Sequence, residues 1–540
     1  MSTAQKLCLD NIHPLYTKGT VYNTYASKAK TRVEMRMIGA SALIRLMPTW
    51  SEHLYNKERR KEWAALVKES LKLTDKEVEY VFAELEYYVQ LEASGYSGEK
   101  LGGVDKVWIN DTAGDCELVN GFKENAAKLA DNHATAYLSG KANKSSDIVQ
   151  ILVDPFTYPF SSLASRFLDR PITTPEAALD FVDSADETHT LNPSLQRVEA
   201  SAVNRSGNTK LVYSASFSDP ATTLRFQSQE ELLSWLPTDF NVNNDGSVQI
   251  LSYINNLHPT RYAGLYGSIS KVFAKMVPLL EQVATDTLHP RDKRAFFDCQ
   301  KTEAYAEPEP LPFNPGNRPI APYSMRGLNL QASVEMTNIN LTPENPTLAE
   351  GRWQAIGRKD ERVFAVGLYF YEMENIASAK LKMRDPIKNH LFRSQKEKDN
   401  FCKAHNVIED SEGDCKLVQE FEGIDIRDGR YICYPNLYQV KMPAFTLADP
   451  TKAGCVKCIA FYIVDPATKV KSTGIIPPRD PSWDKASHPT SSALADTVTL
   501  NLSEQECIRR DFLRRKHAKE NECSQYQFEA SIEVDIYIYG

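Results

Sequence analysis

Long apolar runs are absent from this 540-residue sequence. No segment approaches the roughly 18 consecutive apolar residues that a membrane-spanning helix requires. The first ten residues, Met1 to Asp10, also lack the apolar stretch of a secretory signal. Together these absences predict a cytoplasmic protein that has no membrane partner.

An excess of positive charge is also missing. The chain has 63 Lys and Arg against 71 Asp and Glu, which gives a net charge of -8, whereas a nucleic-acid surface needs a basic stripe. One basic cluster stands out, formed by Arg509, Arg510, Arg514, Arg515 and Lys516. It falls on a predicted helix, where a solvated face is the favoured interpretation over a phosphate site. We therefore expect no nucleic-acid partner.

Cysteines are few and follow no framework. Ten are scattered over the chain, a pattern typical of reduced thiols rather than disulfides. Cys455 and Cys458 form a lone Cys-x-x-Cys without a second pair, and on a strand their side chains would face opposite ways. Zinc binding and redox chemistry are therefore weakly indicated.

Familiar catalytic signatures are missing as well. The sequence contains no Ser/His/Asp nucleophilic arrangement, no Walker loop and no dinucleotide fingerprint. Its composition, 42% hydrophobic and 25% charged, is that of a globular protein large enough for two or three lobes.

The first half of the chain divides by pattern into three parts. Residues 1–185 read as a mainly helical N-terminal lobe, in which Thr74 to Glu77 form a capping box ahead of apolar residues at helical spacing. Residues 186–230 are rich in Ser, Thr and Asn and predict a surface insertion or hairpin. Residues 231–307 predict a hairpin that turns at Asn244-Asp245-Gly246 and a supporting helix over 268–286.

The second half predicts a β-rich unit. Residues 308–323 form a proline-rich connector, and residues 324–540 form a barrel with a C-terminal helix and strand. The expected strands cover residues 330–340, 352–356, 362–372, 430–442, 455–464 and 528–538, and the charged stretch 385–428 is interpreted as a connection. Several strands without long helices between them favour a barrel or sandwich.

Several segments carry a family resemblance. They are Ser-Tyr-Ile-Asn-Asn-Leu-His-Pro at 252–259, Tyr-Phe-Tyr-Glu-Met-Glu-Asn-Ile at 369–376, Tyr-Pro-Asn-Leu-Tyr-Gln at 434–439, Phe-Thr-Leu-Ala-Asp-Pro-Thr-Lys-Ala-Gly at 445–454 and Val-Asp-Pro at 464–466. The chain resembles the mostly fungal family known as domain of unknown function 4246. That resemblance implies an α+β protein with a double-stranded β-helix core, cupin- or jelly-roll-like, buttressed by the helical lobe.

Members of that family look like oxygenases that use Fe(II) and 2-oxoglutarate. The resemblance implies a His-x-Glu strand, a distant His and an Arg that binds the cosubstrate carboxylate. In this sequence the corresponding positions hold Gln354, Ile356, Val440 and Val456. An amide and three hydrocarbons predict that no metal and no other cofactor is bound.

Two interpretations of these positions remain open. Ile356, Val440 and Val456 could fill a collapsed barrel, or they could line an apolar pocket in which Gln354 supplies one amide. The pocket interpretation assigns them, with the neighbouring Trp353, to binding an apolar small molecule.

Four further polar positions are candidates. Lys441 could act as an acid or base, although strand alternation favours an outward side chain. Tyr369 and Tyr371 share a face and could donate hydrogen bonds to a carbonyl, or simply pack. Asn338 and Asn340 lie two apart on the first barrel strand and could both contact the substrate. We assign Gln354, Tyr369, Tyr371 and Lys441 to catalysis, and Asn338 and Asn340 to binding.

The resulting functional hypothesis is an enzyme that needs neither metal nor cofactor. It would act in fungal specialised metabolism as a cyclase, isomerase or lyase on an apolar polyketide- or terpenoid-like intermediate. A non-catalytic ligand-binding or regulatory protein is the first alternative. An Fe(II)- and 2-oxoglutarate-dependent oxygenase with non-standard ligands is the second. No motif indicates the oligomeric state.

Overall fold

The computed structural model describes most of the chain. The described residues are 29–93, 99–111, 116–133, 148–161, 165–181, 188–190, 201–203, 209–211, 233–298, 305–358, 360–387, 392, 394–407, 415–416, 418–480, 483 and 502–523. The predicted strand over 528–538 lies outside them, as does most of the predicted insertion over 186–230.

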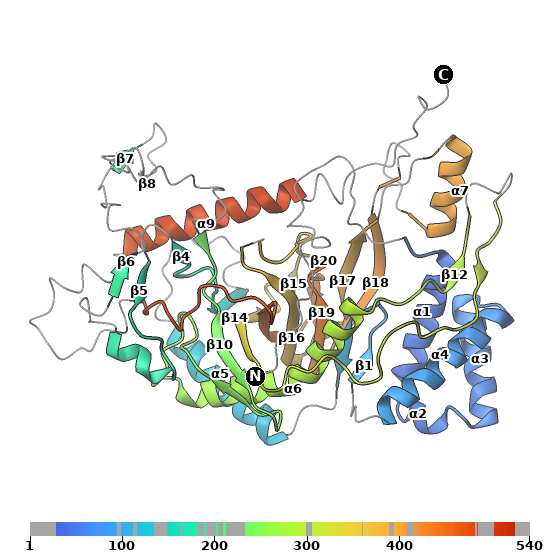
Figure 1. Cartoon of the computed structure of the whole chain (residues 1–540), viewed down its shortest axis with the longest axis horizontal. Helices are drawn as coiled ribbons and strands as arrows, with labels where there is room; N and C mark the ends of the chain where they lie inside the picture. Colours follow the sequence, from blue (N-terminus) through green and yellow to red (C-terminus); the bar gives the residue numbers. More distant parts are fainter. Residues whose placement is uncertain are drawn as a thin grey trace, which may run out of the picture.

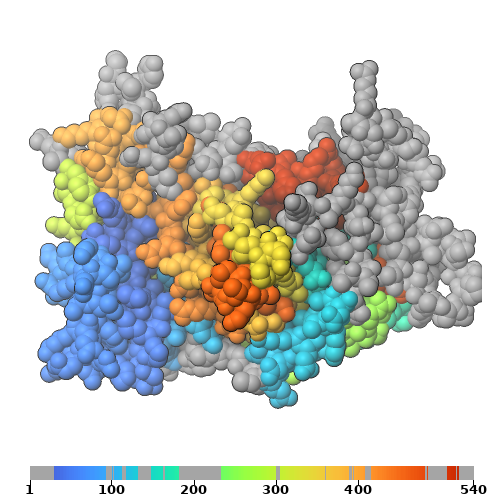
Figure 2. Space-filling model, turned by 180° about the vertical axis from the view of Figure 1, so that it is seen from behind, coloured from blue at the N-terminus to red at the C-terminus, as the bar shows by residue number. Residues whose placement is uncertain are grey.

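Four helices near the start of the chain, coloured blue, form one end of the molecule (Figures 1 and 2). They are α1 (Arg32–Arg45), α2 (Trp50–His53), α3 (Lys57–Leu71) and α4 (Asp75–Ala93). The predicted capping box of α4 is confirmed, because the Thr74 amide donates to Glu77 and the Glu77 amide donates back to Thr74 Oγ1. The range 1–185 is not only helical, since β1 (Glu99–Leu101), β2 (Trp108–Asn110) and β3 (Val149–Val153) pair into the main sheet.

The main sheet is antiparallel and has nine strands. Eight follow the order β1-β2-β19-β16-β22-β14-β10-β11, and β3 pairs with β14 beside this path. Its strands, besides the three above, are β10 (Thr238–Val242), β11 (Val248–Ile250), β14 (Asn329–Leu341), β16 (Val363–Glu374), β19 (Arg430–Pro435) and β22 (Gly454–Val464). The two predicted strands that became β14 and β22 are hydrogen-bonded neighbours along ten residue pairs.

A smaller sheet lies against this one. Its order is β18 (Val418–Ile426), β17 (Ala379–Pro386) and β20 (Gln439–Lys441), and Gln354 extends it by an isolated bridge to Val440. The predicted strand over 430–442 is therefore split, with β19 in the main sheet and β20 in the smaller one. The stretch 385–428, predicted as a connection, supplies β18 and the end of β17.

The remaining helices and strands complete the described structure. They are α5 (Cys116–His133), α6 (Ala263–Leu288), α7 (Gln395–His405), α9 (Leu502–Cys523), the 3-10 helix η3 (Glu176–Phe181), β4 (Phe160–Ser161), β5 (Arg166–Leu168), β6 (Thr188–Thr190), β7 (Ser201–Val203), β8 (Thr209–Leu211), β9 (Leu233–Ser234), β12 (Ala295–Phe296), β13 (Glu309–Pro310), β15 (Thr347–Leu348) and β21 (Phe445–Thr446). β7 and β8 pair in antiparallel fashion within the predicted insertion.

Two apolar clusters occupy the two faces of the main sheet. On one face, which we call the helix side, residues such as Tyr369, Ile459 and Phe461 pack with α5 and α6. On the other face, Phe370, Val456 and Ala460 pack with residues of the smaller sheet, and we call this space between the sheets the interior. Alternation along each strand decides which residues reach which cluster.

One sequence-based expectation about cysteine is wrong. Cys402 at the end of α7 and Cys415 form a disulfide, although the scattered cysteines predicted reduced thiols. Both residues are buried in a small apolar cluster beside α7. The fold brings the two thiols together, and the spacing of cysteines along the chain did not predict this pairing.

Candidate functional site

Gln354 and Val440 form a direct cross-strand pair at one edge of the smaller sheet. Gln354 N donates to Val440 O at 2.9 Å, and Val440 N donates to Gln354 O at 2.8 Å. Side chains of such a pair point to the same face. Val440 is buried in the interior, whereas Gln354 is exposed. The pair therefore lies at the rim of the interior.

Val456 and Ile356 border the same space from two other segments. Val456 on β22 is buried in the interior, paired with Ile339 on one side and Met373 on the other. Ile356 is half-buried and packs at the edge of the interior. Val440, Val456 and Ile356 thus contribute to one apolar cluster, although they come from distant parts of the sequence.

The donor atoms at these positions do not suit ferrous iron. Such a centre needs two imidazoles and a carboxylate on adjacent positions, and the cross-strand pair offers one amide and one isopropyl group. The neighbouring Ile356 and Val456 add only hydrocarbon. We therefore derive no chemistry through iron or 2-oxoglutarate at this rim.

Four of the predicted residues lie on the other face of the main sheet. Tyr369 stacks on Tyr431 at 4.1 Å between ring centroids, and Tyr371 packs against Phe122 of α5 at 4.8 Å. Tyr371 donates a hydrogen bond to Asn338 Oδ1 at 2.9 Å. Burial raises the pKa of Tyr369 to about 12. These phenols belong to the helix-side core and remain protonated.

Asn340 lies on the same face as Asn338 but is exposed. The main sheet separates both asparagines, and both tyrosines, from Val440 and Val456 in the interior. The expectation that all these residues converge on one substrate is therefore corrected. The physical reason is strand parity, which assigned the asparagines of β14 to the face opposite Ile339.

Trp353 and Lys441 lie on the outer face of the smaller sheet, away from the interior. Lys441 forms an ion pair with Glu350 at 3.1 Å, and its ammonium lies 4.8 Å from the centre of the Trp353 ring. The Arg384 guanidinium lies 4.7 Å from the same ring. Neither residue faces Val440, so the structure does not support a catalytic role for Lys441 or a substrate contact for Trp353 in the interior.

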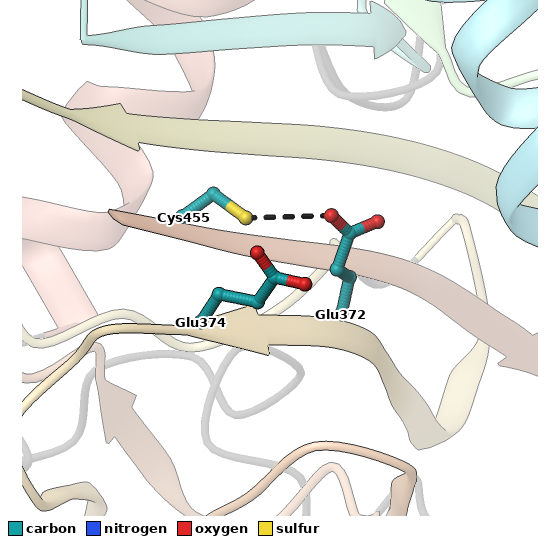
Figure 3. A group of neighbouring side chains, drawn as sticks. All are labelled: Glu372, Glu374 and Cys455. Atoms are coloured by element: carbon teal, nitrogen blue, oxygen red, sulfur yellow. Dashed lines mark hydrogen bonds between the residues drawn. The ribbon is translucent and has the colours of Figure 1, made fainter. Parts of the chain in front are cut away.

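Among the described residues, one group has the spacing of metal ligands. Glu372, Glu374 and Cys455 place their ligand atoms within 4.8 Å of one another on the helix side of the sheet (Figure 3). Lys457 already holds Glu372 at 3.0 Å. Burial, and then the charge of Glu372, raise the pKa of the Cys455 thiol to about 11. A protonated thiol is a poor ligand, Glu372 is already paired with Lys457, and Cys458, which faces the interior, cannot join them.

A polar group that the sequence reasoning missed does face the interior. Glu335 on β14 accepts hydrogen bonds from Tyr462 at 2.9 Å and from Thr337 at 3.2 Å. All three side chains are half-buried, whereas Val334 and Met336, on the other face, are buried. Strand alternation from Ile339 back to Glu335 was the signal that could have found this group.

Trp235 packs against Tyr462 of this group. Its ring centroid is 4.8 Å from that of Tyr462, and the indole is 4% exposed. The Trp235 Nε1 atom is buried and has no hydrogen-bond partner. A buried donor without a partner is uncommon in folded proteins and calls for an explanation.

Family membership rests on a match that covers most of the chain. The family described as "Protein of unknown function (DUF4246)" matches residues 75–487. The chain belongs to this DUF4246 family. No curated protein matches it.

Solved structures show only remote similarity to this DUF4246 chain. The Fe(II)/α-ketoglutarate-dependent dioxygenase TqaL is 7% identical, with 67% of this chain and 93% of that chain covered and a TM-score of 0.23. IDO from Bacillus thuringiensis is 6% identical, with 26% and 48% covered and a TM-score of 0.15. A bsmA homologue from Methylobium petroleophilum PM1 is 7% identical, with 43% and 72% covered and a TM-score of 0.19. This chain thus spans about half of the Bacillus protein.

The helix α9 of the DUF4246 chain, drawn in red in Figure 1, packs against Trp235. Ile508 and Phe512 of α9 are buried against Trp235 and Val363, and Ile356 and Tyr462 pack at the edge of the same cluster. In the described part of the chain, neither α9 nor another helix is long and apolar enough to cross a membrane.

Proposed function

We propose that the two facing sheets form a double-stranded β-helix. Along the chain, β14, β16, β19 and β22 belong to the main sheet, and the Gln354 segment, β17, β18 and β20 belong to the smaller one. This gives eight segments that pass repeatedly between two sheets packed around one apolar interior, as in jelly rolls. The order β19-β16-β22-β14 against β18-β17-β20-Gln354 supports this architecture.

We propose further that the chain is a metal- and cofactor-independent enzyme of specialised metabolism. The observation that carries this proposal is the Gln354–Val440 pair. It puts an amide and a hydrocarbon side by side at the rim, where the resemblance implies two iron ligands. The chemistry left to the interior is orientation and proton transfer, which suits a cyclase, isomerase or lyase.

The surroundings favour an apolar substrate. Val440, Val456, Ile356 and the neighbouring strands present hydrocarbon, and Gln354 adds a single exposed amide at the rim. Binding sites of this kind are mostly apolar, with a small number of polar groups that fix the orientation of the ligand. We therefore propose a polyketide- or terpenoid-like intermediate of low polarity as the substrate.

Two measurements test the proposed function. The purified chain should bind no stoichiometric Fe(II) and should form no succinate from 2-oxoglutarate. Incubated with cyclisable polyketide or terpenoid intermediates in the presence of a chelator, it should produce an isomer or elimination product catalytically. Iron bound in a one-to-one ratio together with succinate formation would establish an oxygenase with non-standard ligands. Stoichiometric binding without product would establish the non-catalytic alternative.

A further inference from the structure

Glu335 is the carboxyl group on the interior face of β14. It lies opposite Ala460 in the pairing of β14 with β22, and Thr337 lies opposite Cys458. Around it the interior is apolar, with Cys458, Ala460 and Tyr434 buried. An acid at such a position is costly unless it is hydrogen-bonded, and Tyr462 and Thr337 supply those bonds. All three side chains are half-buried, in contrast to the buried residues around them.

Trp235 supplies a second and independent indication of a ligand. Its Nε1 donor is buried without a partner, although its backbone amide is satisfied by Glu361 Oε1 at 3.1 Å. The tilted contact with Tyr462 brings this indole beside the Glu335 group. A ligand with an oxygen acceptor would satisfy the indole donor, since buried polar groups normally have a partner.

We propose that Glu335 is the proton-transfer group of the interior, acting on an apolar ketone or enone whose oxygen accepts a hydrogen bond from Trp235 Nε1. Tyr462 and Thr337 are positioning residues that hold the carboxyl group. This inference rests on the proposed function and names the substrate class and the reacting group of the same site.

The reaction is an isomerisation without net oxidation. The Glu335 carboxylate takes a proton from a carbon next to the carbonyl, and the electron pair of that C–H bond forms a C=C bond. The π electrons of the carbonyl move onto its oxygen, where the indole N–H stabilises the charge. The proton then returns from Glu335 to another carbon of the conjugated system. Every atom of the substrate is retained in the product, and no co-reactant is consumed.

The electrostatics of the group suit a base stronger than an ordinary carboxylate. Burial raises the pKa of Glu335 above its ordinary value, against the lowering effect of the Tyr462 hydrogen bond. The charged groups that act on it are Asp154, which raises the pKa further, and Lys516 of α9, which lowers it. A raised pKa makes a carboxylate a stronger base while it is still ionised at the working pH.

Deuterium exchange into an apolar enone tests this inference. The full chain is incubated with β-ionone in D2O, and mass spectrometry measures deuterium incorporated next to the carbonyl. The unmodified chain should accelerate exchange, with a rate that rises with pH through the titration of a carboxyl group. Glu335→Gln should lower the rate by roughly 10²- to 10⁴-fold, the usual contribution of a general base. Trp235→Phe, which keeps the ring contact, should lower it as well.

A matched control replaces a carboxylate on the other face of the sheet. Glu374 is exposed on the helix side, so Glu374→Gln should exchange deuterium as the unmodified chain does. Tyr462→Phe removes a bond that lowers the Glu335 pKa, so the pH midpoint of exchange should move upward. That shift decides the matter if Glu335→Gln does not fold, because a merely structural residue would not move the midpoint.

Three results would overturn the inference: unchanged exchange in Glu335→Gln, an unmoved midpoint in Tyr462→Phe, or no acceleration by the unmodified chain. If the chain converts a biosynthetic intermediate at the same rate with Glu335→Gln, the proposed function stands and this site is eliminated. If no intermediate is converted, yet β-ionone exchange depends on Glu335, the assignment of the base stands while the proposed biosynthetic role does not.

Discussion

Arg294 binds Asp105 through two parallel hydrogen bonds. Arg294 Nη1 donates to Asp105 Oδ2 at 3.0 Å and Nη2 donates to Oδ1 at 2.8 Å. The same guanidinium contacts Glu84 of α4, and its side chain is 3% exposed. The pair connects the segment after α6 with the turn between β1 and β2, and Glu84 connects both to the N-terminal helices.

Replacing Arg294 by Leu should destabilise the fold by about 3–5 kcal/mol, because it leaves Asp105 and Glu84 charged and poorly compensated in a largely buried place. Urea unfolding measures the change. Arg59→Leu is the control, since the Arg59–Glu62 pair is exposed and such pairs contribute roughly 0.2–1 kcal/mol. Equal stability of the two variants would contradict the importance given to this buried network.

The same network makes stability fall in acid. Burial alone would raise the pKa of Asp105, but the charges of Arg294 and Lys30 outweigh it and hold that pKa well below its usual range. A carboxyl group with a lowered folded-state pKa stabilises the fold above its unfolded-state pKa, and this contribution is lost as pH falls toward the folded-state value. The free energy of unfolding should therefore decrease below about pH 4–5. Asp105→Asn should show a shallower decrease, and an identical slope would refute the assignment.

Phe substitutions at the rim should separate effects on protein stability from effects on ligand binding. Ile356 is half-buried, so Ile356→Phe should leave the thermal midpoint nearly unchanged and reduce ligand binding. Val440 is 7% exposed and packs within the interior, so Val440→Phe should lower stability by about 1–3 kcal/mol through overpacking. Calorimetry together with a binding assay checks both. A stable Val440→Phe chain would mean that the space beside Val440 is open.

Tyr371→Phe should affect stability and not chemistry. It removes the donor to Asn338 Oδ1, and Asn338 is 4% exposed, so the loss should amount to about 1–3 kcal/mol for a buried group left without its partner. Deuterium exchange and product formation should stay unchanged, because this bond lies on the helix side. A loss of activity at equal stability would return Tyr371 to the list of catalytic candidates.

The assignment of the four ligand positions at the rim can be tested by restoring the residues that the family resemblance implies. A variant with Gln354→His, Ile356→Glu, Val440→His and Val456→Arg should bind Fe(II), since the 354–440 pair places two imidazoles side by side. Isothermal titration with Fe(II) under anaerobic conditions measures the affinity. The control has Val456→Arg alone, which should bind no metal. A four-residue variant that folds without binding iron would contradict the assignment of the positions.

Much of the fold could be predicted from strand patterns. β14, β16 and β22 lie where apolar alternation and β-branched residues placed them, and the Thr74 capping box marks the start of α4. The strands β17 and β18 were not predicted, because their outer faces carry charged residues, for example Lys380, Lys382 and Glu420. Charged residues at alternate positions resemble a solvated loop when the apolar residues between them are not weighed together.

The site was harder to predict because parity, not residue type, decides which side chains meet. Asn338 and Asn340 of β14 were predicted to bind the substrate because asparagine is uncommon in strands, but both point to the helix side. Glu335, which is three residues before Asn338, points to the interior. A bulge between Phe370 and Glu372 leaves Tyr371 without a partner in the register with β22. One inserted residue of this kind changes the face that later residues occupy, and no pattern in this sequence predicts it.

The helix α9 begins at Leu502, beyond the residues 75–487 that the family shares. Its Ile508 and Phe512 nevertheless pack in one buried cluster with Trp235. The strands that carry Glu335 and Val440 thus lie within the matched range, whereas the α9 residues that pack on Trp235 lie outside it. A substitution at Ile508 or Phe512 would therefore reshape the packing around Trp235 without altering the strands of the matched range.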